Sequence, residues 1–326
     1  VARHHERRVA ELAAALGAEL DRRPRRCFAQ SDHTKGGIAM ARAGPAWRGW
    51  FPVGAELTSG RPDHKEGIYF GTELPNDDPR VRAGTPLHGP NLFPDEPAGL
   101  GTAVLAYLDA ATRVGHAIMS GLAIALGLPR GWFADDLTAD PTVLFRIFHY
   151  PPEVEAPEGG PHLTTPRAPA WGVAEHTDYG LLTLLAQDDR GGLEVRVDGR
   201  WLPVPAEPSV LVCNLGDMLE ALTAGRYRST PHRVRNTSGA GRLSFPLFFD
   251  PGWDARVRPL PLDSLTARSD PSDPPRPTVR SDSDSTPSMQ QRWDRTDPAA
   301  WTGTYGEYLT AKVSRVFPEL FASLEG

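Results

Sequence analysis

The feature that most constrains the fold is a series of short apolar segments, most of them in the second half of the chain, separated by Gly, Asp or Pro. Many short strands at close spacing are typical of a sandwich or jelly roll rather than a parallel sheet. Asp198-Gly199 lies between two of these segments and is a two-residue hairpin signal. We therefore expect a mainly β protein with flanking helices. The predicted strands cover residues 143–150, 181–185, 193–197, 201–204, 210–213, 232–235 and 243–249.

Helical periodicity flanks this strand-rich segment. Apolar residues from Leu100 to Leu128 recur at helical spacing, and Pro129 ends the pattern. This is the strongest predicted helix, and we expect it to lie against the sheet as a scaffold. An amphipathic helix is also predicted over about residues 1–23, with Pro24 as its stop. Further helices are predicted near residues 35–43, 217–222 and 305–325.

Segments of unusual composition connect these elements. Residues 47–70 place Trp, Phe and Tyr among Gly and Pro, which is typical of a functional loop, so we expect contact with a substrate there. Residues 71–99 are rich in Pro and should wrap the surface. Residues 263–300 form a polar low-complexity insert and are a candidate lid.

The chain shows no internal repeat and no linker that would divide it, so we predict a single domain over residues 1–326. Hydrophobic residues make up 40% of it, enough for a sizeable core. The expected parts are a helical and loop region 1–130, a jelly-roll core 140–260 that carries the site, the insert 263–300 and a C-terminal helix in 301–326.

Charge and cysteine usage exclude several classes of protein. The net charge is −6 and no Lys/Arg tract is interleaved with aromatic residues, which argues against a nucleic-acid partner. No apolar run reaches the roughly 20 residues that span a bilayer, and the charged N-terminus lacks the apolar segment of a signal peptide. Cys27 and Cys213 form neither a disulfide framework nor a metal-type spacing. We expect a cytoplasmic protein without a membrane partner.

A candidate metal site begins at His176-Thr177-Asp178. Side chains two positions apart on an extended segment point to the same face, so His176 and Asp178 converge. His232, which opens a distant predicted strand, would add a second imidazole. Two imidazoles and one carboxylate on one side of a metal leave the opposite positions open, as in non-haem Fe(II) oxygenases. We predict these three residues as metal ligands and catalytic centre.

Other interpretations of the same residues remain open. Asp178 could bond nearby backbone in a turn, as Asp often does. The three ligands would also suit Zn²⁺ in a hydrolase, although no general-base Glu stands at a helical metalloprotease spacing. A non-enzymatic jelly-roll module would have a structural metal or none. His149 is expected to line the cavity without acting as a ligand, and the remaining histidines lack a carboxylate at ligand spacing.

Arg242 and Ser244 form a second candidate site. They lie two residues apart on a predicted strand, so the guanidinium and the hydroxyl face one acidic group. A planar fork of donors suits a carboxylate. Arg242 could instead bond a carboxylate elsewhere on the sheet. Its place ten residues after His232 favours an anchor for a carboxylate co-substrate.

Taken together, these motifs closely resemble the isopenicillin-N-synthase-like family of 2-oxoglutarate/Fe(II)-dependent dioxygenases. The order His-x-Asp, His, Arg-x-Ser is highly specific in combination, and the resemblance covers nearly all of the chain. The matching segments are 48–52, 62–66, 146–152, 175–185, 214–217, 227–234 and 242–245.

The resemblance implies a double-stranded β-helix, the jelly roll of these enzymes, with flanking helices. It also implies that His176, Asp178 and His232 ligate Fe(II), with 2-oxoglutarate and O₂ as co-substrates. Arg242 and Ser244 would hold the distal carboxylate of 2-oxoglutarate, with a hydroxyl added by Tyr150. Plant members carry Asn-Tyr-Tyr-Pro where this chain has 148–151, Phe-His-Tyr-Pro, so the Asn contact to the co-substrate is missing.

The implied activity is hydroxylation or desaturation of a small organic substrate, with release of succinate and CO₂, in secondary metabolism. One alternative lies within the same family. An Fe(II)/O₂ oxidase that needs no 2-oxo acid would close a ring, and Arg242 and Ser244 would then grip a carboxylate of the substrate itself.

Overall fold

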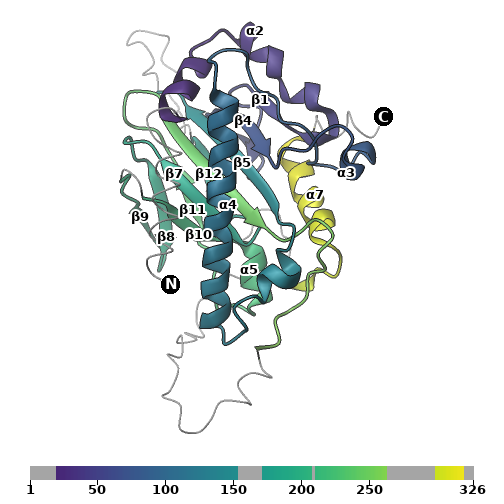
Figure 1. Cartoon of the computed structure of the whole chain (residues 1–326). Helices are drawn as coiled ribbons and strands as arrows, with labels where there is room; N and C mark the ends of the chain where they lie inside the picture. The colour runs from purple at the N-terminus through teal and green to yellow at the C-terminus, as the bar shows by residue number, and fades with distance from the viewer. Residues whose placement is uncertain (1–19, 153–170, 208–209, 263–297, 319–326) are drawn as a thin grey trace.

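The computed structural model describes residues 20–152, 171–207, 210–262 and 298–318, and two antiparallel sheets form the centre of this part (Figure 1). The major sheet contains β1 (Gly49–Phe51), β4 (Glu66–Gly71), β5 (Thr142–Tyr150), β12 (Arg242–Asp250), β7 (Leu182–Gln187) and β10 (Val212–Leu215), in that spatial order. The minor sheet contains β6 (Val173–His176), β11 (His232–Val234), β8 (Leu193–Val197) and β9 (Arg200–Pro203). A ribbon of β2 (Leu57–Thr58) and β3 (Arg61–Pro62) stands apart from them.

Strands from distant parts of the chain alternate within each sheet. β5 pairs with β12 from Arg242↔Tyr150 to Asp250↔Thr142, and β12 then pairs with β7. This alternation is the double-stranded β-helix, so the predicted jelly roll is confirmed. The predicted hairpin is also present: β8 and β9 are joined by Asp198 and Gly199, both with positive φ of 48° and 73°, as a two-residue hairpin turn requires.

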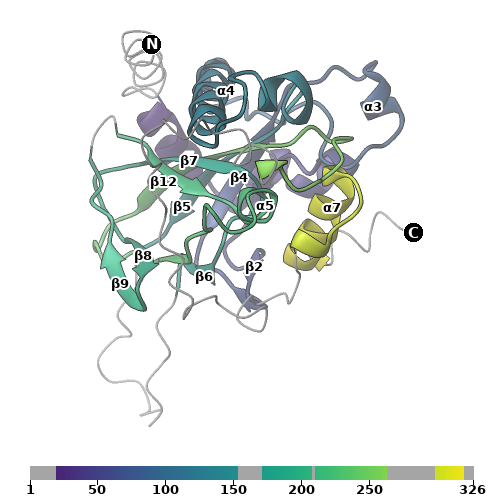
Figure 2. The same cartoon turned by 90° about the horizontal axis from the view of Figure 1, so that it is seen from below.

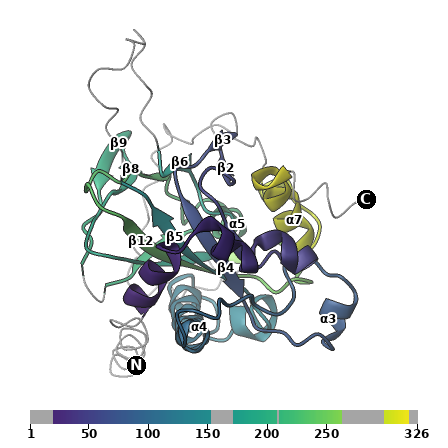
Figure 3. The ribbon, with the colours of Figure 1, turned by 90° about the horizontal axis from the view of Figure 1, so that it is seen from above.

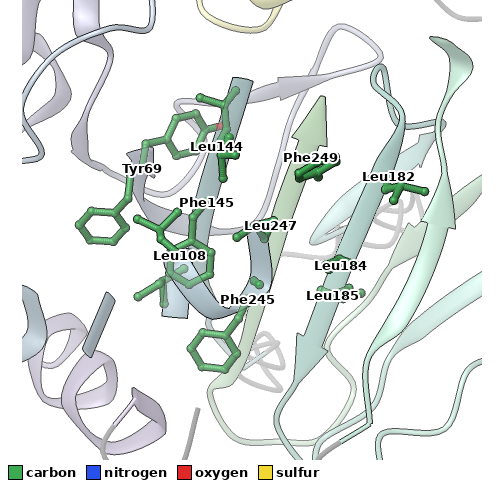
Figure 4. Close-up of a cluster of buried hydrophobic side chains, with 14 of the residues drawn as sticks. Tyr69, Leu108, Leu144, Phe145, Leu182, Leu184, Leu185, Phe245, Leu247 and Phe249 are labelled. Atoms are coloured by element: carbon green, nitrogen blue, oxygen red, sulfur yellow. The ribbon is translucent and has the colours of Figure 1, made fainter. Parts of the chain in front are cut away.

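The long helix α4 (Leu100–Ala125) lies across one face of the major sheet, and the minor sheet lies on the other face (Figures 2 and 3). The predicted scaffold helix is thus confirmed. Residues of β12 alternate between the two faces. Leu243, Phe245, Leu247 and Phe249 are buried in the core on the α4 side, part of which Figure 4 shows. Burying each such side chain contributes about 1.5–3 kcal/mol, which fixes the register of β12 and sends its alternate residues toward the minor sheet.

Shorter helices complete the described part. Thr304 begins α7 with a capping box to Glu307, and α7 lies at the side of the two sheets (Figure 2). The Pro-rich segment 71–99 contains only one short helix, as expected. The bounds are α2 (Asp32–Lys35), η1 (Gly36–Ile38), η2 (Met40–Ala46), α3 (Pro79–Arg82), η3 (Phe133–Leu137), α5 (Asp217–Leu222), η5 (Pro298–Ala300) and α7 (Tyr305–Val316).

Two expectations about the N-terminal part are wrong. Residues 20–28 are helical, so Pro24 does not end the helix. Burial of Cys27 and Phe28 holds the following turn in place, at the cost of one backbone hydrogen bond at the proline. Residues 47–70 are not a loop, because β1 and β4 form the edge of the major sheet there. Most of their aromatic side chains are buried in the core, whereas Tyr69 also lines the cavity described below, so the expected contact with a substrate stays a prediction.

Two other expectations fall partly or wholly outside the described residues. Most of the candidate lid, residues 263–297, lies there, as do residues 1–19 of the first predicted helix. Among the helices that are described, none combines the length and the apolar character needed to cross a membrane.

Candidate active site

A cavity of about 150 Å³ opens between the two sheets. Its floor comes from alternate residues of β5 and β12, those opposite to the residues packed under α4. The minor sheet forms a second wall, and α7 adds apolar side chains such as Leu309 and Val313. All six residues predicted for the site line this cavity: Tyr150, His176, Asp178, His232, Arg242 and Ser244.

The first group is the predicted metal triad. His176 ends β6 and His232 begins β11, and the antiparallel register places the two residues directly opposite each other. Their ring centroids are 4.2 Å apart. Asp178 follows β6, and its Oδ1 lies 3.7 Å from His232 Nε2. One ligand atom from each of His176, Asp178 and His232 can be chosen so that all three lie within 4.8 Å of one another.

Backbone contacts orient both imidazoles for this role. His176 Nδ1 lies 2.8 Å from the carbonyl oxygen of Ala174, and His232 Nδ1 lies 3.1 Å from that of Thr230. A carbonyl can only accept, so each Nδ1 carries the proton and donates it. The lone pair of each Nε2 is then free toward the carboxylate of Asp178. This donor set fits a divalent metal with imidazole and carboxylate ligands.

The electrostatic surroundings keep the imidazole of His176 neutral. Burial, followed by the proximity of His232, lowers the pKa of His176 to about 3. A histidine must be deprotonated to bind a metal, so the ring is ready for a ligand at neutral pH.

The segment that carries Asp178 is fixed by residues that the sequence motifs did not single out. Asn214 Nδ2 donates to Asp178 Oδ2 over 3.4 Å, and the backbone N–H of Asp217 donates to the Asp178 carbonyl over 2.8 Å. Asp250 accepts from the N–H of Leu181 at 3.1 Å. Asn214 and Asp217 belong to the segment 214–217, which resembles the family, and this resemblance was the sequence signal that could have identified them. Asp250 faces the cavity eight residues after Arg242, at the other end of β12.

The second group lies at one end of the cavity around Arg242, which is completely buried. Its Nη2 donates to Gln187 Oε1 over 2.8 Å, and its Nε donates to the carbonyl of Gly191. Its Nη1 has no hydrogen-bond partner among the described residues. No described carboxylate lies within 4.0 Å of the guanidinium, so the alternative of an ion pair across the sheet is wrong for this part of the chain.

Tyr150 and Ser244 stand beside this guanidinium. The hydroxyl of Tyr150 lies 3.3 Å from Ser244 Oγ, and its ring centroid is 4.7 Å from Arg242 Cζ. The register of β5 and β12 brings them together, since Arg242 lies opposite Tyr150 and Ser244 lies opposite Phe148. The structure therefore gathers one cation and two hydroxyls at one place.

The two residues that precede Tyr150 on β5 point to opposite faces of the sheet. Phe148, at the position of the family Asn, faces the cavity with its ring 4.8 Å below the Lys65 ammonium. His149 faces the other way: its Nδ1 lies 2.8 Å from Glu66 Oε1, and it stacks on Phe28. The expectation that His149 lines the cavity is wrong, because strand alternation turns it outward.

Two sequence families match the chain. The 2OG-Fe(II) oxygenase superfamily matches residues 141–251, which include the strands of the site. A family described as the N-terminal part of a non-haem dioxygenase in morphine synthesis matches residues 11–96.

Several curated proteins are similar over most of their length. A Dictyostelium discoideum protein named as a probable iron/ascorbate oxidoreductase is 42% identical, covering 92% of this chain and 82% of that protein. A 1-aminocyclopropane-1-carboxylate oxidase of Dictyostelium mucoroides is 32% identical, covering 84% of this chain and 75% of that protein. A homoarginine-6-hydroxylase of Glycine max is 35% identical, covering 72% of this chain and 70% of that protein.

Solved structures share the fold. A 2OG-Fe(II) oxygenase family protein from Caulobacter crescentus is 26% identical with a TM-score of 0.64, covering 95% of this chain and 87% of that one. A full-length Neurospora crassa protein in complex with alpha-KG, at 22% identity, has a TM-score of 0.63 over 95% of this chain and 82% of that one. The chain therefore belongs to the 2-oxoglutarate/Fe(II)-dependent oxygenase superfamily, in its isopenicillin-N-synthase-like branch, and is an oxidoreductase that uses Fe(II) and 2-oxoglutarate.

Proposed function

We propose that His176, Asp178 and His232 hold the Fe(II) of this dioxygenase, and that Arg242, Ser244 and Tyr150 hold the distal carboxylate of 2-oxoglutarate. The observation that carries the proposal is that Nη1 of the buried Arg242, which lies in the same cavity as the triad, has no hydrogen-bond partner in the described part of the chain. A buried cation with a free donor favours an anion from solution.

The three side chains would hold the metal from one side, which would leave its other side open to a 2-oxo acid and O₂. When bound, Fe(II) supplies the redox chemistry: O₂ activation coupled to oxidation of 2-oxoglutarate to succinate and CO₂. His176 and His232 contribute Nε2 lone pairs, and the backbone contacts of their Nδ1 atoms already orient both rings. Asn214 keeps the Asp178 carboxylate turned toward them.

Arg242 positions the co-substrate. Its guanidinium is held from behind by Gln187 and Gly191, so the remaining N–H can meet a carboxylate without reorganisation. Ser244 and Tyr150 add hydroxyl donors on the same side. Leu185, Leu193 and Val234 surround this end of the cavity with apolar atoms, which exclude water and strengthen the ion pair.

The test is stoichiometry and spectroscopy together. Anaerobic addition of Fe(II) and 2-oxoglutarate to the purified protein should produce the visible charge-transfer band of the chelate. Admission of O₂ with a substrate should then yield one succinate for each O₂ consumed. O₂ consumption without succinate would favour the oxidase that needs no 2-oxo acid, and absence of Fe(II) binding would remove the site.

The primary substrate is a small molecule, as it is for the named relatives. Their names point to different compounds, homoarginine for one and 1-aminocyclopropane-1-carboxylate for another. Both are amino acids, but they differ in size and side-chain charge, so similarity alone does not select the substrate. Hydroxylation is the reaction that we propose first. Desaturation would need only a different pose of the same substrate.

We also propose a cytoplasmic enzyme. Support comes from Cys27 and Cys213, which are both free thiols, because disulfides rather than free thiols accumulate in oxidising compartments. Recovery of the native protein from a secreted fraction would contradict this location.

A further inference from the structure

The cavity contains a second buried arginine, separate from Arg242. Arg146 lies on β5 and faces the cavity like Phe148 and Tyr150, and only 5% of its surface is exposed. Its Nη1 donates to the carbonyl oxygens of Phe70 and Phe145, over 3.2 Å in each case. Arg146 is thus anchored from one side, and its guanidinium borders the space in which a substrate would lie.

No carboxylate of the described residues lies within 4.0 Å of the Arg146 guanidinium. Two buried lysines differ: Lys35 pairs with Glu66 at 2.6 Å, and Lys65 pairs with Glu56 at 2.9 Å. Among the described residues, the buried Arg48 and Arg242 resemble Arg146 in having no carboxylate within 4.0 Å, but Arg48 does not line this cavity. Burial lowers the pKa of Arg146, but arginine stays charged in proteins. A buried charge without a counter-ion is unfavourable, so the site is complementary to an anion that arrives from solution.

This anion site does not overlap with the proposed co-substrate site. Arg146 stands four residues before Tyr150 on the same strand, which corresponds to roughly 13 Å along an extended chain. Arg242 lies opposite Tyr150, so the two guanidinium groups belong to different ends of the cavity. One cavity with two separate cations can hold two carboxylates at once: the co-substrate at Arg242 and a substrate at Arg146.

Tyr69 links Arg146 to an acidic group. The Arg146 Cζ lies 3.4 Å from the Tyr69 ring centroid, and the Tyr69 hydroxyl donates to Glu56 Oε1 over 2.6 Å. Glu56 also lines the cavity, whereas Asp63, which shares the Lys65 ammonium with it, does not. A positively charged group and a carboxylate therefore border the substrate space on either side of a single tyrosine.

We propose that the primary substrate is a zwitterionic amino acid, with its carboxylate on Arg146 and its ammonium group on Glu56. The proposal rests on the proposed function, because it assigns the co-substrate to Arg242. The planar fork of Arg146 suits a carboxylate, and Tyr69 contacts both Arg146 and the carboxylate of Glu56. Leu309, Val313 and Phe317 of the α7 side offer an apolar surface to the rest of the molecule.

The experiment measures the binding of free proteinogenic amino acids to the anaerobic complex of enzyme, Fe(II) and 2-oxoglutarate. The readout is the shift of its visible band, confirmed by calorimetry. At least one amino acid should bind, and its primary amide and its deaminated acid should each bind at least tens-fold more weakly, as expected when one partner of a buried charge pair is lost. If neutral compounds bind and no amino acid does, the proposal is overturned.

Variants separate recognition from folding. Arg146→Gln should lose the amino-acid response tens-fold or more while the affinity for 2-oxoglutarate stays within about twofold. Arg48→Gln is the matched control, since Arg48 is equally buried but lies outside this cavity, and it should retain the response. Glu56→Gln should reduce the preference for the amino acid over its deaminated acid. Unchanged amino-acid binding in Arg146→Gln refutes the proposal.

The proposed function and the proposed substrate class can fail separately. If the wild-type protein gives no band with 2-oxoglutarate, the proposed function fails. If the band forms but Arg146→Gln behaves like Arg48→Gln toward every bound compound, only the substrate class is wrong. Thermal unfolding of each variant shows whether it is folded, and an unfolded Arg146→Gln is replaced by Arg146→Lys, for which a partial loss of amino-acid binding is expected.

Discussion

His176 and His232 face each other across two antiparallel strands, although 56 positions separate them in the chain, and their ring centroids are 4.2 Å apart. Each ring is held by a hydrogen bond from Nδ1 to a backbone carbonyl. The strand register, rather than the side chains themselves, therefore sets the distance between the two Nε2 atoms. A site of this kind exists before any metal binds.

Removal of any one of the three proposed ligands should abolish metal binding. His232→Ala leaves two ligands, and Asp178→Ala leaves two imidazoles, so in each variant bound Fe(II) should fall to background and turnover should be lost. Metal content after anaerobic loading and gel filtration checks this. His33→Ala is the control, because His33 is exposed and does not line the cavity. Normal iron content in Asp178→Ala would show that the carboxylate is not a ligand.

Arg242→Gln should weaken 2-oxoglutarate rather than the fold. Truncating one partner of a buried charge pair costs about 2–5 kcal/mol, which is tens to thousands-fold in affinity. Titration of the visible band with 2-oxoglutarate measures it, with the exposed Arg200→Gln as control. A normal midpoint in Arg242→Gln would show that this arginine has another task.

The sequence was sufficient to predict that His176, Asp178 and His232 converge, because period-two alternation places the first two on one face and His232 opens a strand of the same region. The same rule placed Arg242 and Ser244 on one face. The sequence also indicates that Arg146 and Phe148 share the face of Tyr150, because the three residues lie two positions apart on one predicted strand. Only the structure shows that Arg146 is buried and that no carboxylate of the described residues pairs with it.

Elsewhere local patterns were outweighed by tertiary packing. Residues 47–70 resembled a loop because Gly and Pro interrupt the apolar pattern, yet β4 is buried over all six of its residues. A strand that is covered on both faces shows no alternation, so periodicity cannot identify it. Likewise Pro24 is a helix breaker in isolation, but Leu20 and Phe28 on either side of it are buried.

The pH dependence of stability should reveal Asp250. Burial raises the pKa of Asp250 to about 7, despite the hydrogen bond that it accepts from Tyr305. In the unfolded chain its pKa is near 3.8, so the folded state binds more protons between these two values. Stability from this group is therefore lost as the pH rises from about 4 to 7, by a few kcal/mol at most.

Asp250→Asn removes this proton linkage while keeping an acceptor for the Leu181 N–H. Melting temperatures of the metal-free protein, measured from pH 4 to 7, should fall less steeply in the variant than in the wild type. Asp254→Asn is the control, because Asp254 is exposed on the loop that follows β12. Parallel curves for the wild type and Asp250→Asn would mean that the carboxyl titrates normally.

Two glycines of α4 should respond oppositely to alanine. A Cβ on Gly115 would lie 2.5 Å from Phe249 Cδ2, whereas a Cβ on Gly121 would meet nothing within 4 Å. Gly121→Ala should stabilise by up to about 1 kcal/mol, because alanine is the better helix former. Gly115→Ala gains the same propensity but overpacks the interface with β12, so it should destabilise by about 1–3 kcal/mol. Denaturant unfolding of the metal-free protein measures both, and a stabilised Gly115→Ala would show that α4 does not press on the sheet at Phe249.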